Sequence, residues 1–261
     1  MYRLADLGLT RGHVQDARQL AQQAVDAYHA TQGSYQYLTA AMLDLGEVLE
    51  AQGDLAGARS QFEQSLAIAK KIGALANAAE SQEELARLAI GEGHPEQAEA
   101  SLHGAIAEFE KEKSDPDSSS AYTLLSRALL MQGKLDDART TAQRATELSL
   151  TSSDPALKIS AEIQQGRLDA ARAETDRKRL AVPRRFQAVI ATAHRLGYYT
   201  LECEARLALG ELEVKLNPSS GRKYLTALAV ETRRSGLELL ARHAEAAIPS
   251  GTAIAENRSG R

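Results

Sequence analysis

The chain has 261 residues, which is enough to bury a substantial core, and it carries a formal net charge of −4. Aromatic residues make up only 4% and Trp is absent, while the strong helix formers Ala, Leu, Glu, Gln and Arg dominate the composition. These proportions predict an all-α protein. The acidic balance argues against a generic surface for nucleic acid or for an anionic membrane.

The single cysteine, Cys203, excludes an internal disulfide and lies in a segment that looks helical, so we expect a buried apolar role for it. The N-terminal residues lack the apolar run of a signal peptide. No stretch approaches the roughly 20 apolar residues that span a bilayer. These features predict a soluble, cytoplasmic protein with no membrane partner.

A short pattern, G-x-[LVP]-x-x-A-[RE], recurs along the chain. Its five copies begin at Gly12, Gly53, Gly93, Gly133 and Gly166, and the first four are about 40 residues apart. A glycine can take the left-handed conformation that ends a helix, and the alanine five positions later suits a close approach of two helices. Each copy therefore predicts a tight turn between two antiparallel helices.

Helical periodicity between these turns predicts a chain of helix pairs. The predicted repeats are residues 1–33, 34–73, 74–114, 115–152, 153–197 and 198–248, with a disordered tail at 249–261. Met1 falls inside the first predicted helix, so we expect a fragment or a late-assigned start. The last helix, 237–247, is expected to cover the exposed end of the stack.

Two further patterns refine the helix pairs. Small residues occur seven positions before the first four turn glycines, at Ala5, Gly46, Ala86 and Ser126, whereas the fifth such position holds Ile159. Prolines fall where helices are expected to begin, at Pro95, Pro116, Pro155 and Pro218. The predicted N-cap residues before three of them are Asp115, Asp154 and Asn217.

The pattern resembles the tetratricopeptide repeat, most clearly in Leu45-Gly46, Gly53-Asp54-Leu55, Ala58, Phe62 and Ser65. The resemblance covers residues 1–248 and weakens toward the end. The unit is longer than the family's usual 34 residues and lacks its Trp, and a 40-residue period also fits armadillo and HEAT arrays. The resemblance implies a right-handed α-solenoid, similar to the long-repeat arrays appended to bacterial signalling and transcription regulators.

In such a solenoid the first helix of each pair lines a concave groove. The family's ligand-facing positions correspond here to Glu47, Glu80, Glu83, Arg87, Arg127 and Glu211. The resemblance thus implies a non-catalytic scaffold that binds a peptide or protein. The alternatives are the non-catalytic part of an enzyme, such as a Ser/Thr protein kinase with its catalytic domain upstream, a self-associating array, and a spacer that binds nothing tightly.

The fifth repeat is irregular. A helix is expected to run from Leu168 toward Pro183 and either to kink there or to stop, with a new helix at the proline. This region holds a basic cluster, whose proposed patch is Arg177, Lys178, Arg179, Arg184 and Arg185. The cluster reads either as a solvated helix face or as a docking patch for an acidic partner.

Motifs for catalysis are missing from the sequence. There is no P-loop, no G-x-S-x-G and no H-E-x-x-H, and the six histidines are scattered. Paired carboxylates such as Glu83-Glu84 and Asp136-Asp137 read as solvated helix-start or surface charges. The sequence therefore predicts no enzyme activity, no metal and no cofactor.

Overall fold

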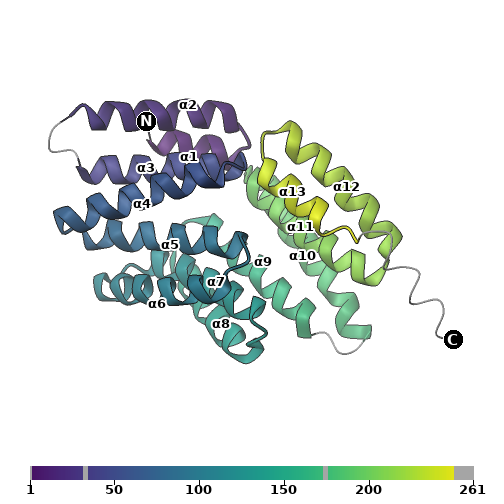
Figure 1. Ribbon diagram of the computed structural model, residues 1–261. Helices are drawn as coiled ribbons and strands as arrows, with labels where there is room; N and C mark the ends of the chain where they lie inside the picture. The colour runs from purple at the N-terminus through teal and green to yellow at the C-terminus, as the bar shows by residue number, and fades with distance from the viewer. Residues whose placement is uncertain (1, 32–34, 173–175, 250–261) are drawn as a thin grey trace.

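A computed structural model describes residues 2–31, 35–172 and 176–249, and every regular element in these ranges is an α-helix (Figure 1). Consecutive helices pack as antiparallel pairs, so the predicted all-α solenoid is confirmed. The elements are α1 (Tyr2–Thr10), α2 (Val14–His29), α3 (Tyr35–Ala51), α4 (Leu55–Ile72), α5 (Leu75–Gly91), α6 (Pro95–Glu112), α7 (Asp115–Met131), α8 (Leu135–Thr151), α9 (Pro155–Arg172), α10 (Asp176–Leu196), α11 (Tyr199–Leu216), α12 (Pro218–Arg234) and α13 (Glu238–Ala246).

Four of the five predicted glycine turns are confirmed. Gly12, Gly53, Gly93 and Gly133 have φ between 76° and 83°, the left-handed conformation that favours glycine. The alanine of each of these four copies is fully buried where the two helices meet. The short pattern therefore marks the turn and the close approach together.

The fifth copy is wrong as a turn, because Gly166 lies inside α9. Gly166 continues the 40-residue series of Gly46, Ala86 and Ser126, the small residues of the first helices. A Cβ on Gly166 would lie 2.7 Å from the ring of Phe186 on α10. The glycine is therefore required by helix packing, and Ile159 is not the small position of this pair.

The prolines begin helices as expected, and two of the three predicted caps are confirmed. Asn217 accepts a hydrogen bond from the backbone N–H of Ser220, and Asp154 accepts one from Ala156. Asp115 is wrong as a cap, because α7 already begins there and Ser114 holds the cap position. The prolines are tolerated because the first helical turn has no backbone partner for its N–H groups.

Pro183 does not divide a helix. α9 ends at Arg172, and α10 begins at Asp176 and continues through the proline to Leu196. The expected single helix from Leu168 to Pro183 is therefore wrong. All but the first residue of the predicted tail at 249–261 lies outside the described residues.

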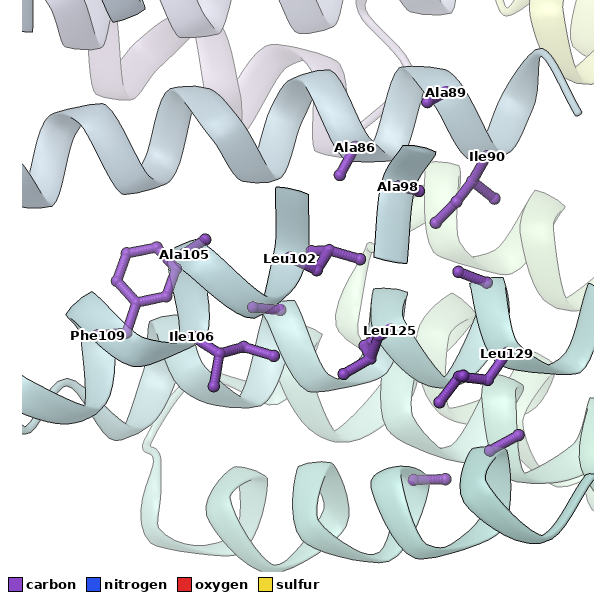
Figure 2. Packing of buried hydrophobic residues seen from close by; sticks show 14 of the residues in the cluster. Ala86, Ala89, Ile90, Ala98, Leu102, Ala105, Ile106, Phe109, Leu125 and Leu129 are labelled. Carbon is purple, nitrogen blue, oxygen red and sulfur yellow. The ribbon is translucent and has the colours of Figure 1, made fainter. Parts of the chain in front are cut away.

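Apolar layers between successive helices form the core. Figure 2 shows one of them, in which side chains from α5, α6 and α7 meet. Leu102 and Phe109 of α6 are almost fully buried there against small residues such as Ala86. Cys203 is fully buried in another layer, as expected. None of the described helices is long and apolar enough to cross a membrane.

The two ends of the solenoid meet. One core cluster combines Val14 and Val48, from the first repeats, with Leu207, Leu237 and other residues of the last helices. Figure 1 shows α13 beside the N-terminal helices, and α13 packs on α3 while α11 packs on α1. The last helix does not simply cover an exposed end, because it also contacts the beginning of the chain.

Polar contacts accompany this closure. The Thr200 hydroxyl donates a 2.7 Å hydrogen bond to the carbonyl of Leu9, and the Arg242 guanidinium donates one of 3.2 Å to the carbonyl of Gly53. These contacts join residues about 190 positions apart, so closure is a property of the whole array.

Truncating the closure cluster is expected to destabilise both ends. Leu237→Ala removes a side chain that is 1% exposed, so we expect a loss of about 2–4 kcal/mol in the free energy of unfolding. Hydrogen exchange should rise in α1 and α2 as well as in α12 and α13. Leu150→Ala, at a residue that is 68% exposed, is the control. Exchange that rises in α12 and α13 alone would contradict the closure.

Candidate functional site

A groove runs along the inner side of the solenoid. Its lining comes from the first helix of every pair, that is from α1, α3, α5, α7, α9 and α11, together with a few residues that precede them. The groove has a volume of about 910 Å³. An extended or helical segment of another chain would therefore meet polar groups from one repeat after another.

In five of the six first helices, the residue that follows the small residue faces this groove. The small residue packs against the second helix, and the next residue lies about 100° further around the helix axis. This places a series of charged side chains in the groove, one from each of five successive first helices: Asp6, Glu47, Arg87, Arg127 and Arg167. The equivalent residue of α11 is Glu211, which lies beside the groove and pairs with Arg167 at 3.0 Å.

Five of the six residues predicted from the resemblance line the groove, namely Glu47, Glu80, Glu83, Arg87 and Arg127. Their role in binding stays a prediction. Sequence reasoning missed Arg167 as a groove residue because Gly166 was assigned to a turn. Its position 40 residues after Arg127 was the available signal.

Carboxylates outnumber guanidinium groups along the groove. Three arginines line it, at positions 87, 127 and 167. The acidic lining residues are Asp6, Asp44, Glu47, Glu80, Glu83, Glu84, Asp117, Asp154 and Glu204. The excess of negative charge lies over α3, α5 and the first half of α7.

Burial and mutual repulsion raise the pKa of several of these carboxyls, among them Asp44, Glu80 and Glu83. The pKa of Glu83 rises to about 8, first because the group is buried and then because Glu84 is close. Burial also raises the pKa of Asp44 and that of Glu80 to about 7, and nearby carboxylates add to each shift. The expectation that Glu83 and Glu84 are solvated surface charges is therefore wrong, since the residue Glu83 is 7% exposed and the side chain of Glu84 is 15% exposed.

Arg87 holds part of the acidic cluster together. Its guanidinium lies 2.7 Å from the Glu50 carboxylate and 3.8 Å from that of Glu47, and it also pairs with Glu84 one turn earlier. Together these carboxylates raise the pKa of Arg87 well above its ordinary value, against the opposing effect of burial. The side chain is fully engaged in contacts within the chain.

Of the proposed basic patch, only Arg184 and Arg185 have described side chains. Both are exposed, and Arg185 pairs with Asp169 at 3.1 Å. The side chains of Arg177, Lys178 and Arg179 lie outside what the structure describes. A docking role for this patch stays a prediction.

The described residues contain no group of three or more His, Cys, Asp or Glu side chains that would hold a metal ion. Burial raises the pKa of Cys203 to about 12, so its thiol stays protonated near neutral pH. Neither the histidines nor this cysteine adds a chemical group to the groove lining.

Solved structures share this architecture. A Rap conjugation gene regulator of plasmid pLS20, in complex with the Phr* peptide, superposes with a TM-score of 0.71 at 15% identity, over 89% of this chain and 62% of the regulator. The apo form of RapI superposes with a TM-score of 0.68 at 13% sequence identity, over 90% of this chain and 82% of RapI. Repeats of a putative kinesin light chain from Podosopora anserina superpose with a TM-score of 0.53 at 21% identity, over 74% of this chain and 94% of the repeat protein. At sequence identities this low, the similarity shows a shared fold and nothing about function.

No curated protein sequence matches the chain significantly. The family model of the tetratricopeptide repeat matches residues 2–79 and 83–155, which is more than half of the chain. The glycine turns, the small residues of the first helices and the paired helices agree with this match. The chain belongs to the tetratricopeptide repeat family.

Proposed function

We propose that the groove binds an extended or helical segment of a protein partner, and that this segment carries several Lys or Arg side chains. The observation that carries the proposal is the lining of nine carboxylates against three guanidinium groups. A cationic segment would compensate this charge and would relieve the repulsion among the carboxylates.

The arrangement of first helices supports a linear ligand. Each first helix contributes polar groups at a regular interval, which suits a chain that lies across several repeats. The Rap regulator with a similar fold is described in complex with a peptide, which supports a peptide ligand here. The proposed role is that of a non-catalytic scaffold.

The proposed setting is the docking or sensor region of a larger bacterial regulator. The chain spans 62% of the Rap regulator's own length. The alternative setting is the non-catalytic part of an enzyme such as a Ser/Thr protein kinase. The reading frame upstream of Met1 distinguishes them, because a DNA-binding or a kinase domain there would assign the setting.

The raised pKa values make stability depend on pH. A carboxyl whose pKa is higher in the folded state than in the unfolded chain binds more protons when folded, between its two pKa values. For Glu83 this window runs from its ordinary value of 4.5 to about 8. Stability from this group is thus present below pH 4.5 and is lost as the pH rises through the window.

We therefore expect the free energy of unfolding to fall between pH 5.5 and pH 8.5, measured by urea denaturation. Glu83→Gln keeps the shape but removes the charge, so it should flatten this dependence and stabilise the protein by about 1–2 kcal/mol at pH 8.5. Glu96→Gln, at an exposed position on α6, should follow the wild-type curve. A Glu83→Gln variant less stable than wild type at pH 8.5 would contradict the charge assignment.

The ligand proposal is tested with two labelled peptides of equal length, (Ala-Lys)6 and (Ala-Glu)6, by fluorescence anisotropy. We expect the lysine peptide to bind, with an affinity that falls as salt is added, and the glutamate peptide not to bind. The assay is run at pH 8.5, above the pKa of about 7 of Asp44 and of Glu80. Asp44→Asn combined with Glu80→Gln and Asp117→Asn should weaken binding of the lysine peptide at least about tenfold, because three groove carboxylates are lost.

The matched control places the same number of neutral substitutions outside the groove. Glu96→Gln, Asp137→Asn and Glu147→Gln remove three exposed carboxylates of second helices. This variant should bind the lysine peptide nearly as wild type does. An equal loss in both triple variants would show attraction to overall charge and would reject the groove as the site.

A further inference from the structure

A smaller pocket lies where the two ends of the solenoid meet, and it adjoins the groove, with which it shares residues such as Arg127 and Glu204. Its apolar wall includes Leu9 of α1, Leu207 of α11 and Leu240 of α13, and its volume is about 120 Å³. An apolar cavity of about 150 Å³ holds a benzene molecule, so this space admits a small organic group. The pocket exists because the chain closes on itself, since neither end supplies its walls alone.

Three arginines, at positions 87, 127 and 167, also line this pocket, together with three glutamates, at positions 47, 50 and 204. Arg87 and Arg167 are engaged, by Glu50 at 2.7 Å and by Glu211 at 3.0 Å. Within the part of the chain that the structure describes, no ion pair or hydrogen bond engages Arg127. Burial and then the charge of Arg167 lower the pKa of Arg127 from its ordinary value.

Neighbouring carboxylates compensate Arg127 only at longer range. Glu204 attracts it most strongly, followed by Glu211 and Glu50, and the last two lie in ion pairs with the other two arginines. Glu204 lines the same pocket and also makes no ion pair among the described residues. A guanidinium that is taken partly out of water without a close partner lowers stability, unless a ligand supplies the partner.

A carboxylate matches the Arg127 guanidinium in charge and in shape. The planar guanidinium donates two parallel N–H bonds to the two oxygens of a carboxylate. The leucines of the same pocket suit a short branched alkyl chain, which gains free energy by leaving water.

We propose that this pocket binds a small aliphatic carboxylate, with Arg127 holding the carboxylate and the leucines of α1, α11 and α13 enclosing the alkyl chain. The carboxylate belongs either to a free acid or to the C-terminal residue of a peptide. The proposal goes beyond the cationic ligand of the groove and does not depend on it. Since the pocket joins both ends, its ligand stabilises the closed array.

The probes are 4-methylpentanoate and its uncharged isostere 4-methylpentanamide, measured by isothermal titration calorimetry. The acid is expected to bind at least about tenfold more tightly than the amide, because only the acid pairs with the guanidinium. N-acetyl-leucine and N-acetyl-leucinamide form the second pair and represent a peptide terminus. Tighter binding of N-acetyl-leucine assigns the site to a peptide, and tighter binding of 4-methylpentanoate assigns it to a free acid. If neither acid binds better than its amide, the proposal is overturned.

Arg127→Met separates binding from folding. We expect this substitution to weaken binding of the acid at least about tenfold. The Tm of the ligand-free protein should stay unchanged or rise by about 2–4 °C, because a charge without a close partner is removed. Glu204→Gln should increase the affinity for the acid, since the substitution removes a carboxylate that repels it. Arg144→Met, at a guanidinium that is 50% exposed and pairs with Glu147, is the matched control and should bind as wild type does.

A lower Tm for Arg127→Met would identify the residue as a structural ion-pair partner and would overturn the proposal, as would unchanged acid binding. The lysine peptide used for the groove provides the independent readout. If it binds while the acids do not, the pocket proposal fails and the groove proposal stands. The reverse result rejects the groove ligand and keeps the pocket.

Discussion

The close approach of the two helices in each pair is the constraint on which the rest of the structure depends. In α3, α9 and α11 it requires a glycine, because a Cβ on Gly46, Gly166 or Gly210 would collide with Phe62, Phe186 or Leu225. The contact fixes the rotation of each first helix about its own axis. The side chain that follows the small residue must then face the groove, so one packing contact also sets the position of the charged series.

Closure of the array turns this series into a shared site. In an open solenoid each repeat contacts only its neighbours, and stability is nearly a sum of local terms. Here Val14 and Leu237 share a cluster, so the first and last repeats are coupled directly. The pocket with Arg127 exists only in the closed arrangement, because both α1 and α13 contribute to its wall.

Local features were predictable from the sequence, because turns and helix starts depend on a few adjacent residues. Gly53 and Pro95 are examples. Arg87, which the resemblance proposed as a ligand-facing residue, lies in the groove lining, and its role in binding stays a prediction. The prediction of a turn at Gly166 was wrong because the residue matches the turn pattern, whereas its 40-residue spacing from Ser126 is that of the small residues at the helix contact. The burial of Glu83 and the closure were beyond prediction, since both depend on how the repeats curve in space.

The groove departs from what stability alone would select. Carboxyls such as Glu83 are held where burial and their neighbours oppose ionisation, and Arg127 lacks a close counterion among the described residues. Neutral side chains of similar shape would fold with less electrostatic cost. Local rules that fail together at one surface point to binding there.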